Sequence, residues 1–407
     1  MSPTPYPPKH PNGLRRQHRT QQILYLHLAA GDCYSRHHSP TATSTEQRLC
    51  CALSHHHTSI ASMEALSQQA LAAEHSILYA LQDRNLPIQD LILHFVNYRK
   101  LCQALIFHDI MRTQQVEERM WNIHSKARKW FSDEYKHLCS QPELKVQRSA
   151  FRDLYSKFLR HSTRFYRDHV AKLNEAFKFP ELRALAQMAY PDMGSKDAQS
   201  RQPVNPEWQA VALKSCHRCL IYLGDLARYR TADGLDKKKH NEPDYTAATQ
   251  FYDLAAAICP SNGHGHHQQA VIARACGDHL GAVYHLYRSC SVSEPYPNAA
   301  SNLKAEFDKI ASARRKQELV QKSAPNDPQG PKQALIGWFV HLHYICFKGR
   351  EYPPLDELEQ EVLGQLSHEL KQRSLDGDLL RMSMVNMAAQ YRAIEMFKRQ
   401  YSACPYA

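Results

Sequence analysis

One predicted helix near the middle of this 407-residue chain combines three basic residues with one acidic residue. It spans about residues 206 to 230, and separations of 4, 7 and 3 residues place Lys214, Arg218, Asp225 and Arg228 on one face. Guanidinium groups hold phosphate oxygens well, and a nearby carboxylate can keep a guanidinium in position. The face therefore suits an anion site, although a solvated surface with an Asp225–Arg228 ion pair accounts for the same residues.

A second basic face lies on an upstream helix. It carries Lys126 and Lys129, with Arg119 and Arg128 nearby. The apolar residues of this helix recur at the spacing of one helical face; they are Val116, Met120, Ile123, Ala127, Trp130 and Leu138. If this helix folds against the helix at 206–230, the two basic faces could converge in a groove.

No enzyme motif is present in the sequence. It contains no GxxxxGK[ST] or GxGxxG phosphate-binding loop, no HExxH zinc motif and no GxSxG nucleophile motif. The 12 cysteines are mostly scattered through apolar helical segments, which indicates reduced thiols in an intracellular protein. Cys216 and Cys219 form half of a zinc motif without a second half, so we expect them in the core. The sequence therefore predicts a protein that is not an enzyme and has no metal or cofactor.

The charge of the chain is strongly basic. Lys and Arg number 51 against 40 Asp and Glu, a formal net charge of +11. This excess suits an anionic partner, such as a phosphorylated protein or a nucleic acid, or it is an ordinary basic surface. No segment reaches the roughly 18 consecutive apolar residues of a membrane span, so a membrane partner is not expected.

The periodicity predicts an all-α fold. Residues 1–62 are rich in Pro, His and Ser and are expected to be a disordered tail. The first predicted helix begins at Met63, and the helical segments continue to a Pro-containing linker before residue 331. We expect one helical domain at 63–312 and the start of a further helical region at 331–407, which looks incomplete.

Two short helical hairpins are predicted after a charged insert. Small and apolar residues have the separations of a tetratricopeptide repeat, in which small residues let two helices approach closely. The first set is Ala248, Tyr252, Ala255 and Pro260, and the second, less regular set is Ala282, Leu286, Ser289 and Pro295. Since two repeats cannot form a free-standing solenoid, they should pack on the upstream helices as one body.

Several segments of the chain resemble the same known family. They are Cys219-Leu-Ile-Tyr-Leu-Gly-Asp-Leu-Ala-Arg-Tyr-Arg230, Ala-Ala-Ala-Ile-Cys-Pro-Ser-Asn-Gly at 255–263, Gly-Asp-His-Leu at 277–280, and Tyr-His-Leu-Tyr-Arg-Ser-Cys-Ser at 284–291. These segments are similar to the Est1/SMG family, whose members act in nonsense-mediated mRNA decay and telomerase recruitment. The resemblance is strong at 206–310 and weaker over 63–407. It implies a 14-3-3-like domain that binds phosphoserine, with the TPR-like hairpins and the C-terminal helical region attached.

The resemblance also assigns site residues. Arg228 falls on the family's phosphate-binding arginine, and Lys126, five residues after Trp121, falls on its phosphate-binding lysine; Arg128 or Lys129 would serve if the alignment slips. Tyr229 matches a tyrosine beside the arginine, and Lys214 and Arg218 would enlarge the positive field around the phosphate. One departure is His267, which stands where related proteins have Asn in a Tyr-Asn-Gln-Leu run.

The resemblance implies a non-enzymatic adaptor in mRNA decay, present in nucleus and cytoplasm, that recruits the phosphorylated RNA helicase of the pathway. An alternative is a telomerase-associated subunit that binds RNA or telomeric single-stranded DNA through Lys237–Lys239 and Arg314–Lys316. A third reading is a helical scaffold without a tight anion site.

Overall fold

The computed structural model describes residues 47–82, 88–177, 205–235, 243–320, 330–349, 351–372, 375 and 377–402. The chain divides into two compact units, and the boundary falls within one long helix, α7 (Pro206–Ala232). The first unit comprises Met1–Ser215 and Ala232–Lys239, and the second comprises Cys216–Thr231 and His240–Ala407. Residues 63–312, which we predicted to form one body, are shared between these two units. The predicted domain limits stay a prediction.

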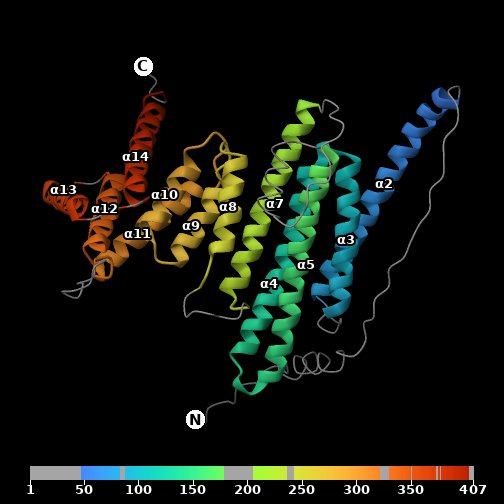
Figure 1. Ribbon diagram of the computed structural model, residues 1–407, viewed down its shortest axis with the longest axis horizontal. Coiled ribbons are helices and arrows are strands. Elements are labelled where there is room, and N and C mark those ends of the chain that lie inside the picture. Colours follow the sequence, from blue (N-terminus) through green and yellow to red (C-terminus); the bar gives the residue numbers. More distant parts are fainter. Residues whose placement is uncertain are drawn as a thin grey trace, which may run out of the picture. The chain divides into compact units, whose positions relative to one another are not determined.

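Long helices in hairpin order make up the first unit (Figure 1). They are α2 (Gln47–Gln82), α3 (Ile88–His108), α4 (Thr113–Cys139) and α5 (Lys145–Phe177), with short 3-10 turns η2 (Ile110–Arg112) and η3 (Pro142–Leu144) before α4 and α5. The core between them is aromatic: Phe131 stacks on Tyr155 and on Phe158, with ring centroids 5.3 and 4.8 Å apart. Such stacked pairs stabilise beyond the apolar area that they bury.

Helix α2 begins earlier than predicted, at Gln47 instead of Met63. Because no Pro or Gly interrupts the chain from Gln47 to Gln82, nothing in the local sequence ends the helix at Met63. The remainder of the predicted tail, residues 1–46, lies outside the described residues.

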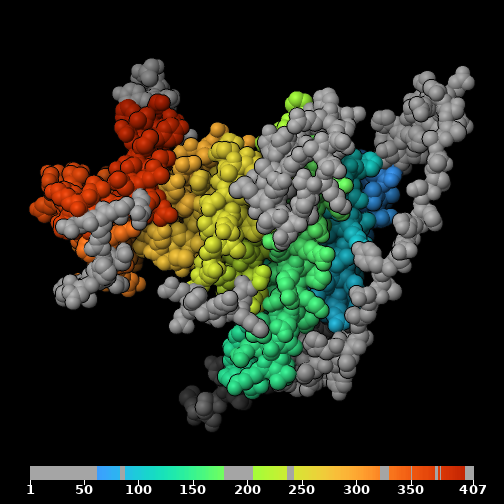
Figure 2. All heavy atoms as spheres, viewed as in Figure 1, coloured from blue at the N-terminus to red at the C-terminus, as the bar shows by residue number. Residues whose placement is uncertain are grey.

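Short hairpins make up the second unit, which continues from the C-terminal part of α7. They are formed by α8 (Thr246–Ile258), α9 (His264–Ala275), α10 (His279–Cys290), α11 (Ala299–Arg315), α12 (Gly330–Lys348), α13 (Leu355–Gln372) and α14 (Gly377–Ser402). Figure 2 shows the side chains of α8 to α11 packed into one continuous surface. The predicted repeat positions Ala248, Tyr252 and Ala255 on α8, and Ala282, Leu286 and Ser289 on α10, are all buried. The all-α fold with TPR-like hairpins is thus confirmed. Among the described helices, none is both long and apolar enough to cross a membrane.

Helices α7 and α8 approach each other closely at Gly224. A Cβ atom at this position would lie 2.3 Å from Cε1 of Tyr252, well inside van der Waals contact. The Tyr252 ring is fully buried, so it has no room to withdraw. Gly224 is therefore required by the side chain that packs on it.

We expect Gly224→Ala to destabilise the protein by about 1–3 kcal/mol, because the added methyl group overpacks this contact. Gly364→Ala is the matched control, since a Cβ there meets nothing within 4 Å and α13 should gain about 0.5–1 kcal/mol. Urea unfolding followed by circular dichroism measures both. A Gly224→Ala protein as stable as wild type would contradict the contact.

Candidate phosphate-binding site

Arg228, on the last turns of α7, is held in one position by three side chains. Its Nη2 donates a hydrogen bond to Asp225 Oδ1 at 2.9 Å, and its Nε donates to the Tyr252 hydroxyl at 3.2 Å. The guanidinium carbon lies 4.7 Å from the centre of the Tyr229 ring, a cation–π contact. The Tyr252 hydroxyl also donates to Asp225 Oδ1 at 2.6 Å, which closes a ring of hydrogen bonds. The arginine side chain is 18% exposed, so it is not closed off from solvent.

The charges of this group are settled by its surroundings. Burial alone would lower the pKa of Arg228, but Asp225 and then Tyr252 and Tyr229 outweigh it, and the pKa is raised. The pKa of Tyr252 is raised well above its usual value, by burial first and by Asp225 second. Near neutral pH the site therefore holds a cationic arginine and a neutral tyrosine. Asp225 accepts a hydrogen bond from only one of the arginine's N–H groups.

Aromatic and imidazole rings form a second wall, next to Arg228. His267 on α9 stacks on Tyr296, with centroids 3.9 Å apart, and its Nε2 lies 2.7 Å from Asn302 Nδ2. His264, one turn earlier, packs on the same Tyr296 ring at 4.8 Å. Burial lowers the pKa of His267 to about 4, and the positive charges of His264 and Arg228 act in the same direction. His267 is therefore a neutral ring that accepts from Asn302 and lies within the field of Arg228.

The predicted polar face of α7 is wrong at one position. Asp225 is 3% exposed instead of facing solvent. The physical reason is that α7 is apolar around its whole circumference from Cys219 to Leu223, so it is buried on all sides there. An acidic residue in such a segment has to be paired, which explains its bond to Tyr252. Lys214 remains exposed and Arg218 is half-buried.

The basic residues of α4 belong to the first unit and differ in their pairing. Arg119 forms an ion pair with Glu74 at 3.0 Å, Arg128 with Asp233 at 3.5 Å and Lys129 with Asp133 at 2.7 Å. Lys126 is exposed, and within the described residues no acidic side chain lies within ion-pair distance of it. Because Lys126 and Arg228 lie in different units, their pairing on one phosphate stays a prediction.

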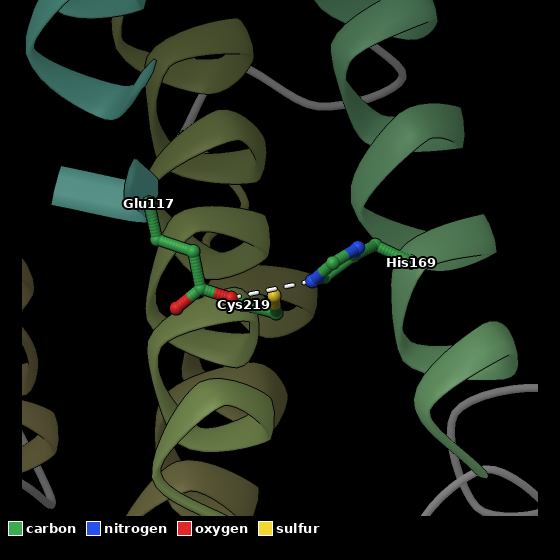
Figure 3. A group of neighbouring side chains, drawn as sticks. All are labelled: Glu117, His169 and Cys219. Carbon is green, nitrogen blue, oxygen red and sulfur yellow. Dashed lines mark hydrogen bonds and ion pairs between the residues drawn. The ribbon is translucent and has the colours of Figure 1, made fainter. Parts of the chain in front are cut away.

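A buried polar network in the first unit escaped the sequence analysis. Figure 3 shows Glu117 of α4 and His169 of α5 pointing toward one another, with Oε1 and Nε2 3.2 Å apart and both side chains fully buried. The Ser215 hydroxyl donates to the same Glu117 oxygen at 2.5 Å, and Gln103 Nε2 lies 3.2 Å from His169 Nδ1. Glu117 could have been found, because it falls on the core face of α4, three residues before Met120. The network connects α3, α4, α5 and α7 by hydrogen bonds and so stabilises their packing.

The ring wall of the site was also missed, apart from His267. His264, Tyr296 and Asn302 come from α9, the loop between α10 and α11, and α11, and no spacing rule connects them. Tyr252 was predicted only as a buried repeat residue, whereas the structure also makes it a hydrogen-bond partner of Arg228. Cys216 and Cys219, expected in the core, are both fully buried.

Two family models match the chain and together cover more than half of it. The model described as "Telomerase activating protein Est1" matches residues 115–232, and "Est1 DNA/RNA binding domain" matches residues 248–404. The first contains Lys126 and Arg228, and the second contains the helices α9 to α14.

Relatives with curated names point the same way. The chain is 30% identical over 226 residues to nonsense-mediated mRNA decay factor SMG7 of Arabidopsis thaliana, covering 52% of this chain and 20% of that protein. It is 24% identical over 277 residues to SMG7 of Danio rerio, covering 67% of this chain and 21% of that protein. The chain therefore spans about a fifth of the length of these relatives. A structure titled "Crystal structure of Est1 and Cdc13" has a TM-score of 0.60 at 13% identity, covering 81% of this chain and 64% of that one, and it supports the fold.

A pair of histidines behind the site makes stability depend on pH. His266 of α9 and His285 of α10 lie with their Nδ1 atoms 3.2 Å apart. Burial lowers the pKa of His266 to about 4 and that of His285 to about 3, and in both cases nearby positive charge adds to the effect. In the unfolded chain a histidine has a pKa of about 6.5. Between these values the unfolded state binds more protons, so the free energy of unfolding falls as pH is lowered from about 6.5 toward 4.

We therefore expect the melting temperature to be lower at pH 5 than at pH 7.5, and expect His285→Asn to show a smaller difference than wild type. His368→Asn, a change at an exposed histidine, is the control and should behave as wild type. Calorimetry at the two pH values measures this. The assignment fails if His285→Asn loses as much stability on acidification as the unmodified chain.

Proposed function

The chain belongs to the Est1/SMG family of non-enzymatic adaptors, and we propose that it binds a phosphorylated serine of a partner protein through Arg228. The observation that carries this proposal is the state of the Arg228 side chain, which is charged, held by Asp225 and Tyr252, and 18% exposed. A guanidinium has five N–H groups, and Asp225 and Tyr252 accept from two of them. The remaining groups suit the oxygens of a phosphate.

Asp225 does not oppose such a ligand. Its carboxylate is buried, and Oδ1 accepts from both Arg228 and Tyr252, so little of its negative charge reaches the surface. Its contribution is to restrict the rotamers of the arginine before the ligand arrives, which reduces the entropy lost on binding. Tyr229 covers one face of the guanidinium through the cation–π contact and so restricts its movement. In this proposal Asp225 and Tyr229 are positioning residues for the phosphate-binding arginine.

Lys126 is the second cation of the proposed site. Among the basic residues of α4, Arg119, Arg128 and Lys129 each face an acidic partner, so their charges are partly compensated. The ammonium group of Lys126 is exposed and keeps its full charge available for an anion. This difference favours Lys126 over Arg128 and Lys129 as the lysine of the family's phosphate clamp. Lys214 and Arg218 would add to the positive potential without direct contact.

The partner proposed for this site is a phosphorylated RNA helicase of the mRNA decay pathway, met in nucleus or cytoplasm. The SMG7 relatives, named as decay factors, support that role. His267 replaces the asparagine of related proteins and accepts a hydrogen bond from Asn302, so its ring carries no donor toward a ligand at Nε2. We therefore expect the peptide backbone around the phosphoserine to be held less firmly than the phosphate.

A second candidate function is nucleic-acid binding, which the match to the Est1 DNA/RNA binding domain favours. Of the residues predicted for it, Lys237–Lys239 lie outside the described residues. Arg314 at the end of α11 stacks on Trp338, 4.7 Å from its ring centre, beside Arg315 and Lys316. A basic helix end next to an aromatic ring is a feature of single-strand binding surfaces, and Trp338 is partly exposed. Binding of RNA, telomeric DNA or a telomerase complex there would weaken steeply with salt and would not require phosphoserine.

We expect Arg228→Glu to weaken binding of a fluorescent degenerate phosphoserine peptide library by at least about tenfold, since a charge-assisted phosphate contact contributes roughly 1.5–3 kcal/mol. Arg228→Gln, which removes the positive charge and adds no negative charge beside Asp225, is measured in parallel. Fluorescence anisotropy gives both affinities. Equal affinities for wild type and both variants would show that Arg228 does not bind phosphate.

A charge reversal on α4 tests the second cation. Lys126→Glu should weaken phosphopeptide binding by about the same factor as Arg228→Glu. Lys129→Glu makes the same change in net charge one turn away, at a lysine already paired with Asp133, and should have little effect. If the two lysine variants lose affinity equally, only the general positive field acts and the two-residue clamp is wrong.

A further inference from the structure

The second unit contains an acidic pocket that is separate from the Arg228 site in the chain. It lies between the first turn of α12 and one face of α13 and has a volume of about 280 Å³. The residues that line it are Pro331 and Ala334 of α12, and Glu361, Gly364, Gln365, His368 and Glu369 of α13. Glu361, Gln365 and Glu369 follow at steps of four residues and so form one column along the helix.

Glu369 carries the unusual feature of this pocket. It is 1% exposed, and within the described part of the chain neither of its carboxylate oxygens has a hydrogen-bond partner. A buried carboxylate without donors is expensive, and native structures rarely leave one unpaired. The arrangement therefore indicates a donor that the described residues do not supply.

Gln365 adds a third unpaired acceptor. Its Nε2 donates to Glu361 Oε1 at 2.5 Å, and because a carboxylate only accepts, the amide nitrogen has to face Glu361. The Gln365 carbonyl oxygen then faces away from Glu361, and it too is buried without a donor among the described residues. The pocket thus offers three buried acceptors, two on Glu369 and one on Gln365.

The nearest basic residue on α12 is already paired. Lys332, next to Pro331, forms an ion pair with Asp378 of α14 at 2.7 Å. The first turn of α12 carries the partial positive charge of a helix N-terminus, which lowers the cost of the Glu369 carboxylate but makes no hydrogen bond to it. A cation from outside the chain is therefore the natural partner.

We propose that this pocket binds an arginine side chain of a partner protein. A guanidinium has five N–H donors and no acceptor, which matches a pocket with three unpaired acceptors. Its planar fork can donate to both oxygens of Glu369 while a further N–H reaches Gln365. Pro331, Ala334 and the bare backbone at Gly364 provide an apolar wall for the methylene groups of the arginine.

Two other cations fit less well. An ammonium group is a compact point charge and cannot make the two parallel hydrogen bonds that both Glu369 oxygens require. A metal ion needs several ligand atoms at one point, and the only described His, Cys, Asp and Glu side chains whose ligand atoms approach within 4.8 Å as a group of three lie elsewhere.

The charge of α13 supports a basic partner segment. In a chain of net charge +11, this helix carries Asp356, Glu357, Glu359, Glu361 and Glu369 against Lys371. Such a local reversal of sign favours the approach of a basic segment and repels the chain's own basic surface. The proposal does not depend on phosphate binding at Arg228.

The test uses the full 407-residue chain and three fluorescein-labelled peptides: hexa-arginine, hexa-lysine and hexa-citrulline, the last isosteric with hexa-arginine but neutral. At physiological salt hexa-arginine should bind most tightly. Glu369→Gln should weaken it by at least about tenfold, while Glu359→Gln, the same change at an exposed position of α13, should alter affinity less than about twofold. Glu369→Gln should unfold at the same or a higher temperature, because it removes an uncompensated buried charge.

A second variant guards against a misfolded Glu369→Gln protein. Gly364→Leu leaves Glu369 intact and places a side chain into the open pocket, so it should weaken hexa-arginine binding as well. Equal hexa-arginine affinity in wild type and both variants would overturn the proposal. Equal Glu369-dependent binding of hexa-lysine would overturn the assignment of a guanidinium, and Glu369-dependent binding of Zn²⁺ or Mn²⁺ without arginine binding would identify a metal site instead.

Discussion

The hydrogen bond from the Tyr252 hydroxyl to Asp225 is the interaction on which the phosphate site depends. It places an acidic residue next to the segment of α7 that is buried on all sides, and it lets the same carboxylate hold Arg228. The Tyr252 ring can reach this position only because Gly224 leaves α7 bare where α8 crosses it. The residues of the Leu-Gly-Asp-Leu-Ala-Arg segment therefore act together. Gly224 leaves room for the Tyr252 ring, Asp225 accepts from the Tyr252 hydroxyl, and Arg228 follows one turn later.

The second unit contains two buried carboxylates that differ in their hydrogen bonding. Asp225 Oδ1 accepts hydrogen bonds from two donors of its own chain, Arg228 and Tyr252, and this restricts the rotamers of Arg228. Glu369 has no donor from the described chain, so the pocket around it is incomplete. A protein interior tolerates an unpaired charge only at a cost, and such a cost is usually found where a ligand restores the balance. An outward cation on α7 and an inward anion on α13 would suit an adaptor that holds one partner by a phosphate and another by an arginine.

Much of the fold follows from the sequence, and the reasons are local. The 3.6-residue period located α3, α4, α5 and the helices of the second unit, and Pro206 marked the first turn of α7 because proline is tolerated there. The small residues of the repeats predicted which positions of α8 and α10 are buried. Periodicity gave a wrong result where the helix does not have one apolar and one polar face. Around Asp225 the helix is buried on all sides from Cys219 to Leu226, so no face could be assigned to solvent.

Only some residues of the site were predicted from the sequence. Arg228, Lys126 and Tyr229 came from family resemblance, and His267 from a departure within it. Tyr296 and Asn302 lie far along the chain from Arg228 and meet the α9 histidines only through the folded hairpins. Recognition of the phosphate by Arg228 is measured by the ratio of dissociation constants for unphosphorylated and phosphorylated forms of one peptide library. We expect a ratio of at least about ten in wild type that falls toward one in Arg228→Gln. An unchanged ratio in the variant would show that Arg228 does not recognise the phosphate.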